Sequence, residues 1–182
     1  MDMPRSEATQ SQYSVPLTAP PTLILGFGNP DREDDGVAWH ILRALAERFG
    51  HPLHHWDESE PDADSPSPHL MFTLQLVPEQ VDMLHRYQRV CFVDAHTGAY
   101  AEDIHFATVQ PDYHPSPFTH HLTPETCLML TKATHGHAPR AVVVSVRGHQ
   151  FGFVCGLTPA TQRLAQAAVE RILAWLEQET TS

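Results

Sequence analysis

The chain has 182 residues, a length typical of one domain and sufficient for a core that needs no disulfide or metal to hold it together. It carries 22 Asp and Glu against 11 Lys and Arg, and the resulting formal net charge of -11 argues against nucleic acid as a partner, since phosphates require a basic face. A hydrophobic content of 41% without any membrane-spanning apolar run argues against both a disordered acidic chain and a membrane protein.

Residues 1–21 are rich in Pro, Ser, Thr and Gln and contain no apolar stretch of the kind found in secretory signals. We therefore predict a disordered N-terminal extension and a cytoplasmic protein. The three cysteines, Cys91, Cys127 and Cys155, are isolated in the sequence, which is typical of reduced cytosolic thiols.

Residues 22–178 are predicted to form a single α/β domain, because apolar strand segments alternate with helical periodicity. The fold class expected is a three-layer sandwich with a mostly parallel, twisted sheet of about five strands and helices on both faces. A segment rich in Pro, Ser and Asp, 58–69, is predicted to be a mobile surface loop. In chain order, the expected elements are a strand at 22–27, a helix at 34–49, strands at 51–56 and 72–77, a helix at 78–86, strands at 89–95 and 104–109, a helix at 123–133, a strand at 141–146 and a helix at 159–176.

A glycine-containing turn, Gly26-Phe27-Gly28-Asn29-Pro30, follows the first strand, but Asp31 stands where a dinucleotide-binding turn has its third glycine. Glu33, Asp34 and Asp35 follow, and their carboxylates would repel a pyrophosphate. The turn is better suited to a cation.

Asp35, at the start of the first predicted helix, and Asp94, at the carboxyl end of the central strand where ligands bind in such sheets, are expected to converge, and His120 or His121 before the next helix would complete the set. Carboxylate oxygen and imidazole nitrogen together suit a divalent cation. The alternative remains open that the aspartate only caps a helix and the histidine is solvated. Most of the 14 histidines, His135 and His137 among them, are expected to be solvated.

The chain resembles the hydrogenase maturation proteases, which trim the C-terminus of the large subunit of nickel–iron hydrogenases. Three segments carry the resemblance in the family's order: residues 26–30 followed by Asp34-Asp35-Gly36, then Phe92-Val93-Asp94-Ala95, then Thr119-His120-His121-Leu122-Thr123. Gly156-Leu157-Thr158-Pro159 before the last helix supports it. The chain departs from the family pattern where Asp94 is not followed by the usual Pro-Gly pair.

The resemblance implies that Asp35, Asp94 and His120 are metal ligands and that Asp35 and Asp94 are catalytic. His120 is preferred to His121 because Leu128 follows it by eight residues. The metal would be nickel carried by the substrate, so no cofactor of the protein's own is expected, although a divalent cation bound adventitiously is compatible with the ligands.

The function implied is therefore an endopeptidase that removes the C-terminal extension of a hydrogenase large-subunit precursor after nickel insertion, with that precursor as its partner and neither nucleic acid nor membrane. Both polarisation of the scissile carbonyl by the metal and activation of water by an aspartate remain open as mechanisms. One alternative is a non-catalytic, chaperone-like module that binds the precursor or its nickel. A second is a hydrolase or transferase of a small metabolite, which requires a deep pocket near Asp94.

Overall fold

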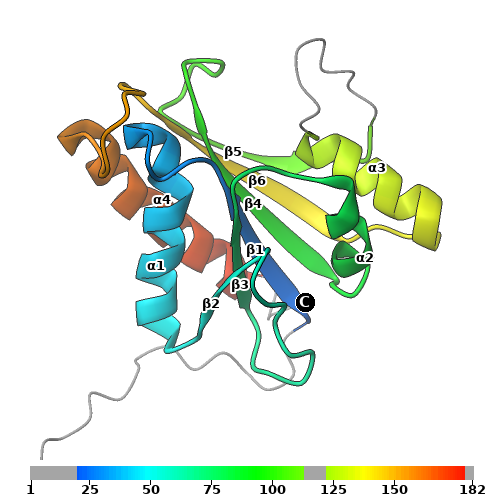
Figure 1. The fold of residues 1–182 in the computed structure, drawn as a ribbon. Helices are drawn as coiled ribbons and strands as arrows, with labels where there is room; N and C mark the ends of the chain where they lie inside the picture. Colours follow the sequence, from blue (N-terminus) through cyan, green and yellow to red (C-terminus); the bar gives the residue numbers. More distant parts are fainter. Residues whose placement is uncertain (1–19, 113–121, 179–182) are drawn as a thin grey trace, which may run out of the picture.

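The computed structural model describes residues 20–112 and 122–178, within which six strands form a single sheet (Figure 1). The strand order is β2-β3-β1-β4-β6-β5, and within the described residues β5 is the one antiparallel strand. The strands are β1 (Thr22–Phe27), β2 (Leu53–His55), β3 (His69–Thr73), β4 (Arg89–His96), β5 (Ile104–Val109) and β6 (Arg140–Arg147).

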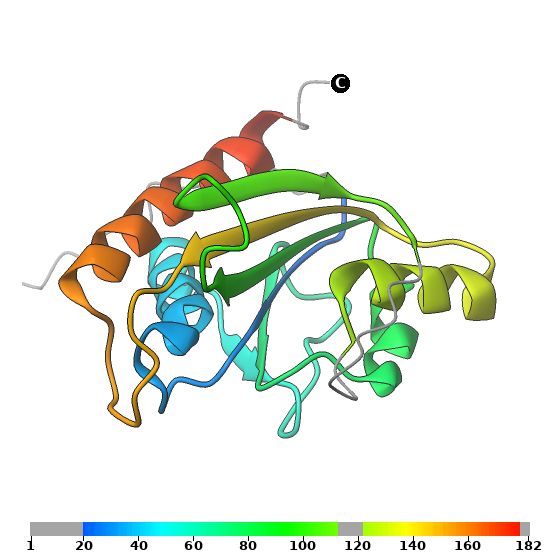
Figure 2. The same cartoon turned by 90° about the horizontal axis from the view of Figure 1, so that it is seen from above.

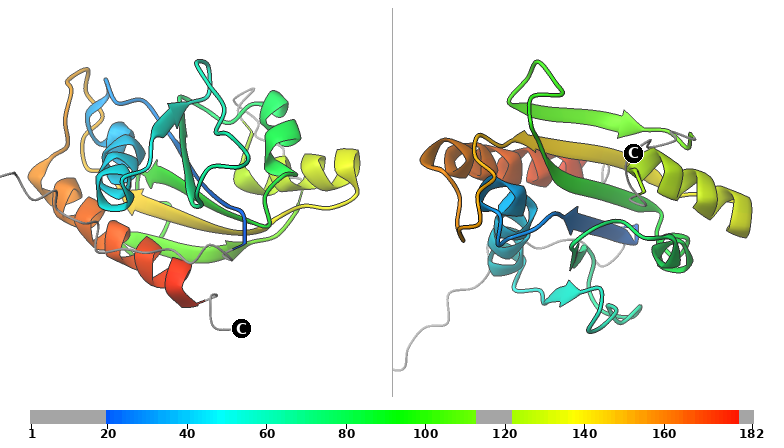
Figure 3. Two further views of the ribbon diagram at one scale, coloured as in Figure 1. Left: turned by 90° about the horizontal axis from the view of Figure 1, so that it is seen from below. Right: turned by 45° about the horizontal axis from the view of Figure 1, so that its top comes forward.

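Helices cover both faces of this sheet (Figures 2 and 3). One face carries α1 (Val37–Phe49) and α4 (Pro159–Gln178), which pack against each other. The other carries α2 (Val81–Leu84) and α3 (Pro124–His135), and short 3-10 turns, η1 (Glu33–Gly36) and η2 (Pro78–Gln80), precede α1 and α2. No helix in the described part of the chain is long and apolar enough to cross a membrane.

Successive residues of the central strands serve two separate cores, because side chains alternate between the faces of a sheet. In β1, Ile24 packs toward α1 and α4, whereas Leu23 and Leu25 pack toward α2 and α3. All three are fully buried, as is expected of a parallel strand covered on both sides. The predicted three-layer α/β sandwich is thus confirmed, with six strands rather than about five, and the strand predicted at 51–56 is the three-residue edge strand β2, which pairs with β3.

The predicted strand at 72–77 is displaced: β3 begins at His69 and ends at Thr73. The imidazole of His69 is buried and hydrogen-bonded to the Tyr87 hydroxyl at 2.8 Å, so its polar atoms are satisfied inside the strand. The irregular segment predicted at 58–69 therefore ends before His69. The helix predicted at 78–86 is shorter and consists of η2 followed by α2, which ends at Leu84.

Of the predicted N-terminal extension, 1–21, the structure describes Pro20 and Pro21, and the disorder of the remainder stays a prediction. The Pro21 carbonyl accepts hydrogen bonds from the backbone N–H groups of Gln88 and Arg89, so the chain is already fixed before β1 begins. Cys91 and Cys127 are buried, Cys155 is exposed, and all three are free thiols.

Candidate active site

The turn between β1 and η1 brings Asp35 back over the end of the first strand. Gly28 has φ +137°, and a Cβ atom at this position would overlap the carbonyl oxygen of Asp35. The backbone N–H of Asn29 donates a hydrogen bond to Oδ2 of Asp35 at 3.1 Å. Glycine is required here both for the backbone conformation and for this close approach.

Asp34, the neighbour of Asp35, is fully buried and acts as a structural anchor. Its carboxylate accepts backbone hydrogen bonds from His149, Gln150 and Thr158 and hydroxyl hydrogen bonds from Thr158 and Thr161. Burial alone would raise the pKa of this carboxyl, but the hydrogen bonds outweigh it and lower the pKa below its ordinary value. Asp34 thereby fastens the segment after β6 to the turn that carries Asp35.

Asp94 lies near the C-terminal end of β4, opposite Ser145 of β6. Burial raises its pKa to about 7; the charges of Glu125 and Asp35 add to this effect, and the Ser145 hydroxyl opposes it. Its Oδ1 atom is buried and has no hydrogen-bond partner among the described residues. A buried carboxylate oxygen without a donor is a site that a cation or a proton can fill.

His96 follows two residues later in β4 and is also buried. Its Nδ1 accepts a hydrogen bond from the backbone N–H of Gly98, and its ring packs edge-on against Tyr100. Its Nε2 atom is buried without a hydrogen-bond partner in the described ranges. The sequence did not single out this residue, although alternation along the strand places its side chain on the same face as Asp94.

Glu125 is a third carboxylate in this neighbourhood and was also missed. Thr123 caps α3 by accepting a hydrogen bond from the Thr126 N–H, and Pro124 occupies the first turn. This start of α3 brings Glu125 close enough to Asp94 to raise its pKa. The sequence feature that could have indicated Glu125 is its position two residues after Thr123, the N-cap of α3.

Several solved structures with the same fold are hydrogenase maturation proteases, although no protein-family model and no curated protein matches the chain. The hydrogenase maturating endopeptidase HybD from E. coli superposes with a TM-score of 0.63 at 20% identity, over 87% of this chain and 93% of that one. The maturation protease HycI from Thermococcus kodakarensis gives a TM-score of 0.60 at 18% identity over 88% and 95%, and HybD from the same archaeon gives 0.57 at 15% over 86% and 99%. The chain has the fold of the hydrogenase maturation proteases.

Within this hydrogenase maturation protease fold, Asp35 lies close enough to Asp94 for its charge to help raise the Asp94 pKa, and the metal-binding and catalytic roles of the two residues stay predictions. His120 and His121 fall outside the described residues, so the choice between them stays a prediction. The N–H of Leu122, the next residue, is hydrogen-bonded to the Leu76 carbonyl at 3.4 Å. Among residues 20–112 and 122–178, no three His, Cys, Asp or Glu side chains are arranged to hold a metal.

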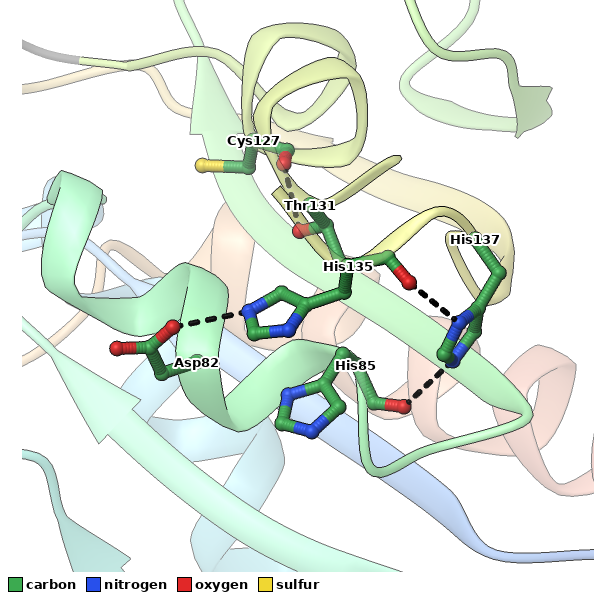
Figure 4. A network of polar contacts seen from close by, with 6 residues as sticks. All are labelled: Asp82, His85, Cys127, Thr131, His135 and His137. Carbon is green, nitrogen blue, oxygen red and sulfur yellow. Dashed lines mark hydrogen bonds and ion pairs between the residues drawn. The ribbon is translucent and has the colours of Figure 1, made fainter. Parts of the chain in front are cut away.

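A second group of histidines lies between α2 and α3 (Figure 4). The rings of His85 and His135 stack with centroids 3.9 Å apart, and His135 Nε2 lies 2.9 Å from Oδ1 of Asp82. His137 is hydrogen-bonded to the His85 carbonyl at 3.0 Å. The expectation of solvation holds for His137, which is exposed, but not for His135, whose half-buried ring is stacked on His85 and held by Asp82.

Two cavities in the described structure are lined by residues other than Asp94. One cavity, of about 400 Å³, lies at the N-terminal ends of the strands, where Arg89 begins β4 and Arg140 begins β6. Another of about 370 Å³ lies between α1 and α4, beside Ile41 and Ala165. The deep pocket near Asp94 that a small-metabolite enzyme requires is not one of these two.

Proposed function

We propose that this chain is an endopeptidase that removes the C-terminal extension from the precursor of a nickel–iron hydrogenase large subunit after nickel insertion. Asp35, Asp94 and His120 would recognise the nickel carried by that substrate. The protein would work in the cytoplasm, where its three free thiols stay reduced.

The observation that carries this proposal is the state of Asp94. A buried carboxylate with a pKa of about 7 and an unpartnered oxygen lies within the electrostatic reach of Asp35, at the edge of the sheet where ligands bind in this class of fold. Two hard carboxylates suit a divalent cation, and a protein-bound cation whose coordination is incomplete would accept them. The shared fold with maturation proteases supports the same assignment.

Asp94 is also the better candidate for handling protons. A general base works best when its pKa lies near the pH of the reaction, and in the metal-free protein the pKa of about 7 for Asp94 meets this condition; nickel bound by the same carboxylate would lower it. Asp35, held by the Asn29 N–H, would then serve chiefly to bind and orient. The attacking water would give its proton to Asp94, and the protonated Asp94 would then pass that proton to the departing amine as the peptide bond breaks.

The test uses purified large-subunit precursors with and without nickel, and the mass of each is followed after incubation with the chain. We expect loss of the C-terminal extension from the nickel-loaded form alone. Asp35→Ala, Asp94→Ala and His120→Ala should each reduce processing at least about 100-fold, whereas Asp82→Ala, an exposed carboxylate on α2, should leave it unchanged.

Processing of neither form would overturn the proposal. If the chain captures the nickel-loaded precursor on a column without shortening it, the chaperone-like alternative is correct instead.

A further inference from the structure

Exposed hydrophobic side chains are concentrated at the edge of the sheet that holds Asp35 and Asp94. In the described part of the chain, four large hydrophobic residues are more than one-third exposed: Leu74 (65%), Tyr100 (37%), Phe153 (89%) and Val154 (60%). Leu74 follows β3, Tyr100 follows β4, and the other two follow β6, so all four lie beyond the carboxyl ends of parallel strands. Apolar exposure gathered around one site marks a contact surface, whereas scattered exposure does not.

The segment after β6, residues 148–158, is called here the anchored loop. Asp34 accepts hydrogen bonds from the backbone of His149 and Gln150, and Glu33 accepts one from the Gly152 N–H at 2.6 Å. The N–H of Glu33 in turn donates to the Val154 carbonyl at 2.8 Å. These bonds fix the main chain of the loop to the acidic turn, while the side chains of Phe153 and Val154 remain in solvent.

Phe153 is 89% exposed on a loop whose main chain is already fixed, so little conformational entropy of the loop is lost when a partner binds. Association is opposed by the entropy of ordering side chains and loops, so a preorganised apolar anchor gives more affinity than a mobile one. Aromatic anchors contribute disproportionately to protein interfaces. Arg32 lies over one face of the Phe153 ring, 5.7 Å from its centroid, and the rest of this side chain remains in solvent, which fits a binding role.

We propose that Phe153 and Val154 are the docking anchor for the protein substrate of this chain, and this inference rests on the proposed peptidase function. The occupant would be a folded protein with an apolar surface beside a segment of positive charge. Charge supports this choice, because Asp31 and Glu33 are hydrogen-bonded to the loop beside the anchor in a chain of net charge -11, and they outnumber Arg32, whose guanidinium lies over the Phe153 ring at 5.7 Å.

A hollow beside the anchored loop gives the partner a place to insert a side chain. Its volume is about 320 Å³, and it lies between Asp31 of the turn and Cys155 of the loop. Trp39, packed against His55 and Phe72, forms its wall. An exposed anchor next to an aromatic hollow is the pattern of projection and recess that fixes the register of a protein interface.

The experiment compares wild type with the double variant Phe153→Ser/Val154→Ser in processing of a nickel-loaded large-subunit precursor. We expect KM to rise about tenfold or more while kcat stays within about twofold, because the lost contact is the same in the ground state and the transition state. Phe153→Leu/Val154→Ile keeps the apolar surface and should restore KM. Because the loop is held through its main chain, the urea midpoint of the double variant should equal that of wild type.

The outcomes separate the two proposals. Processing by wild type with an unchanged KM for the double variant overturns the docking anchor and leaves the peptidase assignment intact. No processing by wild type overturns both. If sedimentation shows that wild type self-associates and the double variant does not, the anchor binds a second copy and the substrate assignment is wrong.

Discussion

Asp34 and Asp35 are adjacent in the sequence, but their carboxylates lie in different surroundings. Asp34 is fully buried and accepts five hydrogen bonds from the segment after β6 and the start of α4. Asp35 is partly exposed and accepts one from the Asn29 N–H. Asp34 therefore holds the site together, and Asp35 is the one of the two to which the proposed binding role is assigned.

Asp34→Asn should lower the free energy of unfolding at pH 7 by about 2–4 kcal/mol, because an amide cannot accept all of these bonds and its own NH₂ group would face backbone donors. The pKa of Asp34 is lowered in the folded protein, so its stabilisation is present above pH about 4 and is lost as the pH falls. Urea unfolding at pH 7 and pH 3 measures both effects, and the difference between wild type and variant should shrink at pH 3.

Asp31→Asn is the matched control, since Asp31 lies in the same turn but is exposed. It should change the free energy of unfolding by less than about 0.5 kcal/mol. An equal loss in both variants would mean that Asp34 is not the anchor.

Asp94 should have the opposite pH dependence. Its pKa is about 7 when folded and near 4 when unfolded, so between these values the folded state binds more protons than the unfolded state. Stability attributable to Asp94 therefore falls as the pH rises from about 4 to about 7 and is constant above. Asp94→Asn should unfold with a free energy about 1–3 kcal/mol higher than wild type at pH 8 and similar at pH 4, as measured in urea.

At the scale of elements, the site depends on the turn between β1 and η1. Gly28 allows Asp35 to fold back onto this turn, and the structure leaves no room for a Cβ atom there. Gly50, which ends α1, also has a positive φ (+68°), but a Cβ atom at this position would meet nothing within 4 Å. An alanine at position 50 therefore adds only backbone strain, whereas an alanine at position 28 adds backbone strain and also displaces Asp35.

Under the proposed peptidase function, Gly28→Ala should reduce processing of the precursor about 100-fold or more, because displacement of the carboxylate proposed to bind the nickel by about 1 Å is sufficient for such a loss. Gly50→Ala should cost about 1 kcal/mol of stability and leave processing unchanged. Steady-state kinetics and urea unfolding of both variants provide the measurements. Equal activity in the two variants would show that the turn tolerates a side chain at position 28.

Elements with a strong apolar pattern were predictable from the sequence, and those held by polar contacts were not. The run from Thr22 to Phe27 and the Val-rich β6 were located because burial on both faces requires continuous apolar residues. The start of β3 was missed because His69 enters the strand through its bond to Tyr87, a residue 18 positions away. Asp94 was selected as a candidate because it stands at the end of a predicted strand. The effect of Glu125 on the Asp94 pKa depends on how α3 packs against the sheet, and no local sequence pattern predicts that packing.

At the scale of the whole molecule, the end of the sheet at which the parallel strands terminate differs from the end at which they begin in the side chains that it exposes. The edge at the carboxyl ends of the strands holds Asp35 and Asp94 together with the exposed hydrophobic side chains. The opposite edge holds the cavity lined by Arg89 and Arg140. Substrate is therefore expected to approach from one end of the sandwich.

The fold also predicts the reactivity of its thiols. Cys91 and Cys127 are buried, and burial raises the pKa of Cys127 to about 12, so neither should react in the native protein. Cys155 is exposed, but its hydrogen bond to Asp31 raises the pKa of the thiol. A thiol-specific disulfide reagent should modify one cysteine per chain before denaturation and three after it, and Asp31→Asn should accelerate the native reaction at pH 8.

The anchored loop is attached through its main chain, and this attachment has a consequence for divergence. Backbone N–H and carbonyl groups are the same whatever side chain follows, so substitutions at Phe153 and Val154 leave Asp34 and Glu33 with their hydrogen bonds. A gene duplicate could exchange one client protein for another by changes in this loop, with the acidic turn left intact. We therefore expect paralogues of this chain to keep the aspartate pair and to vary most at these two positions.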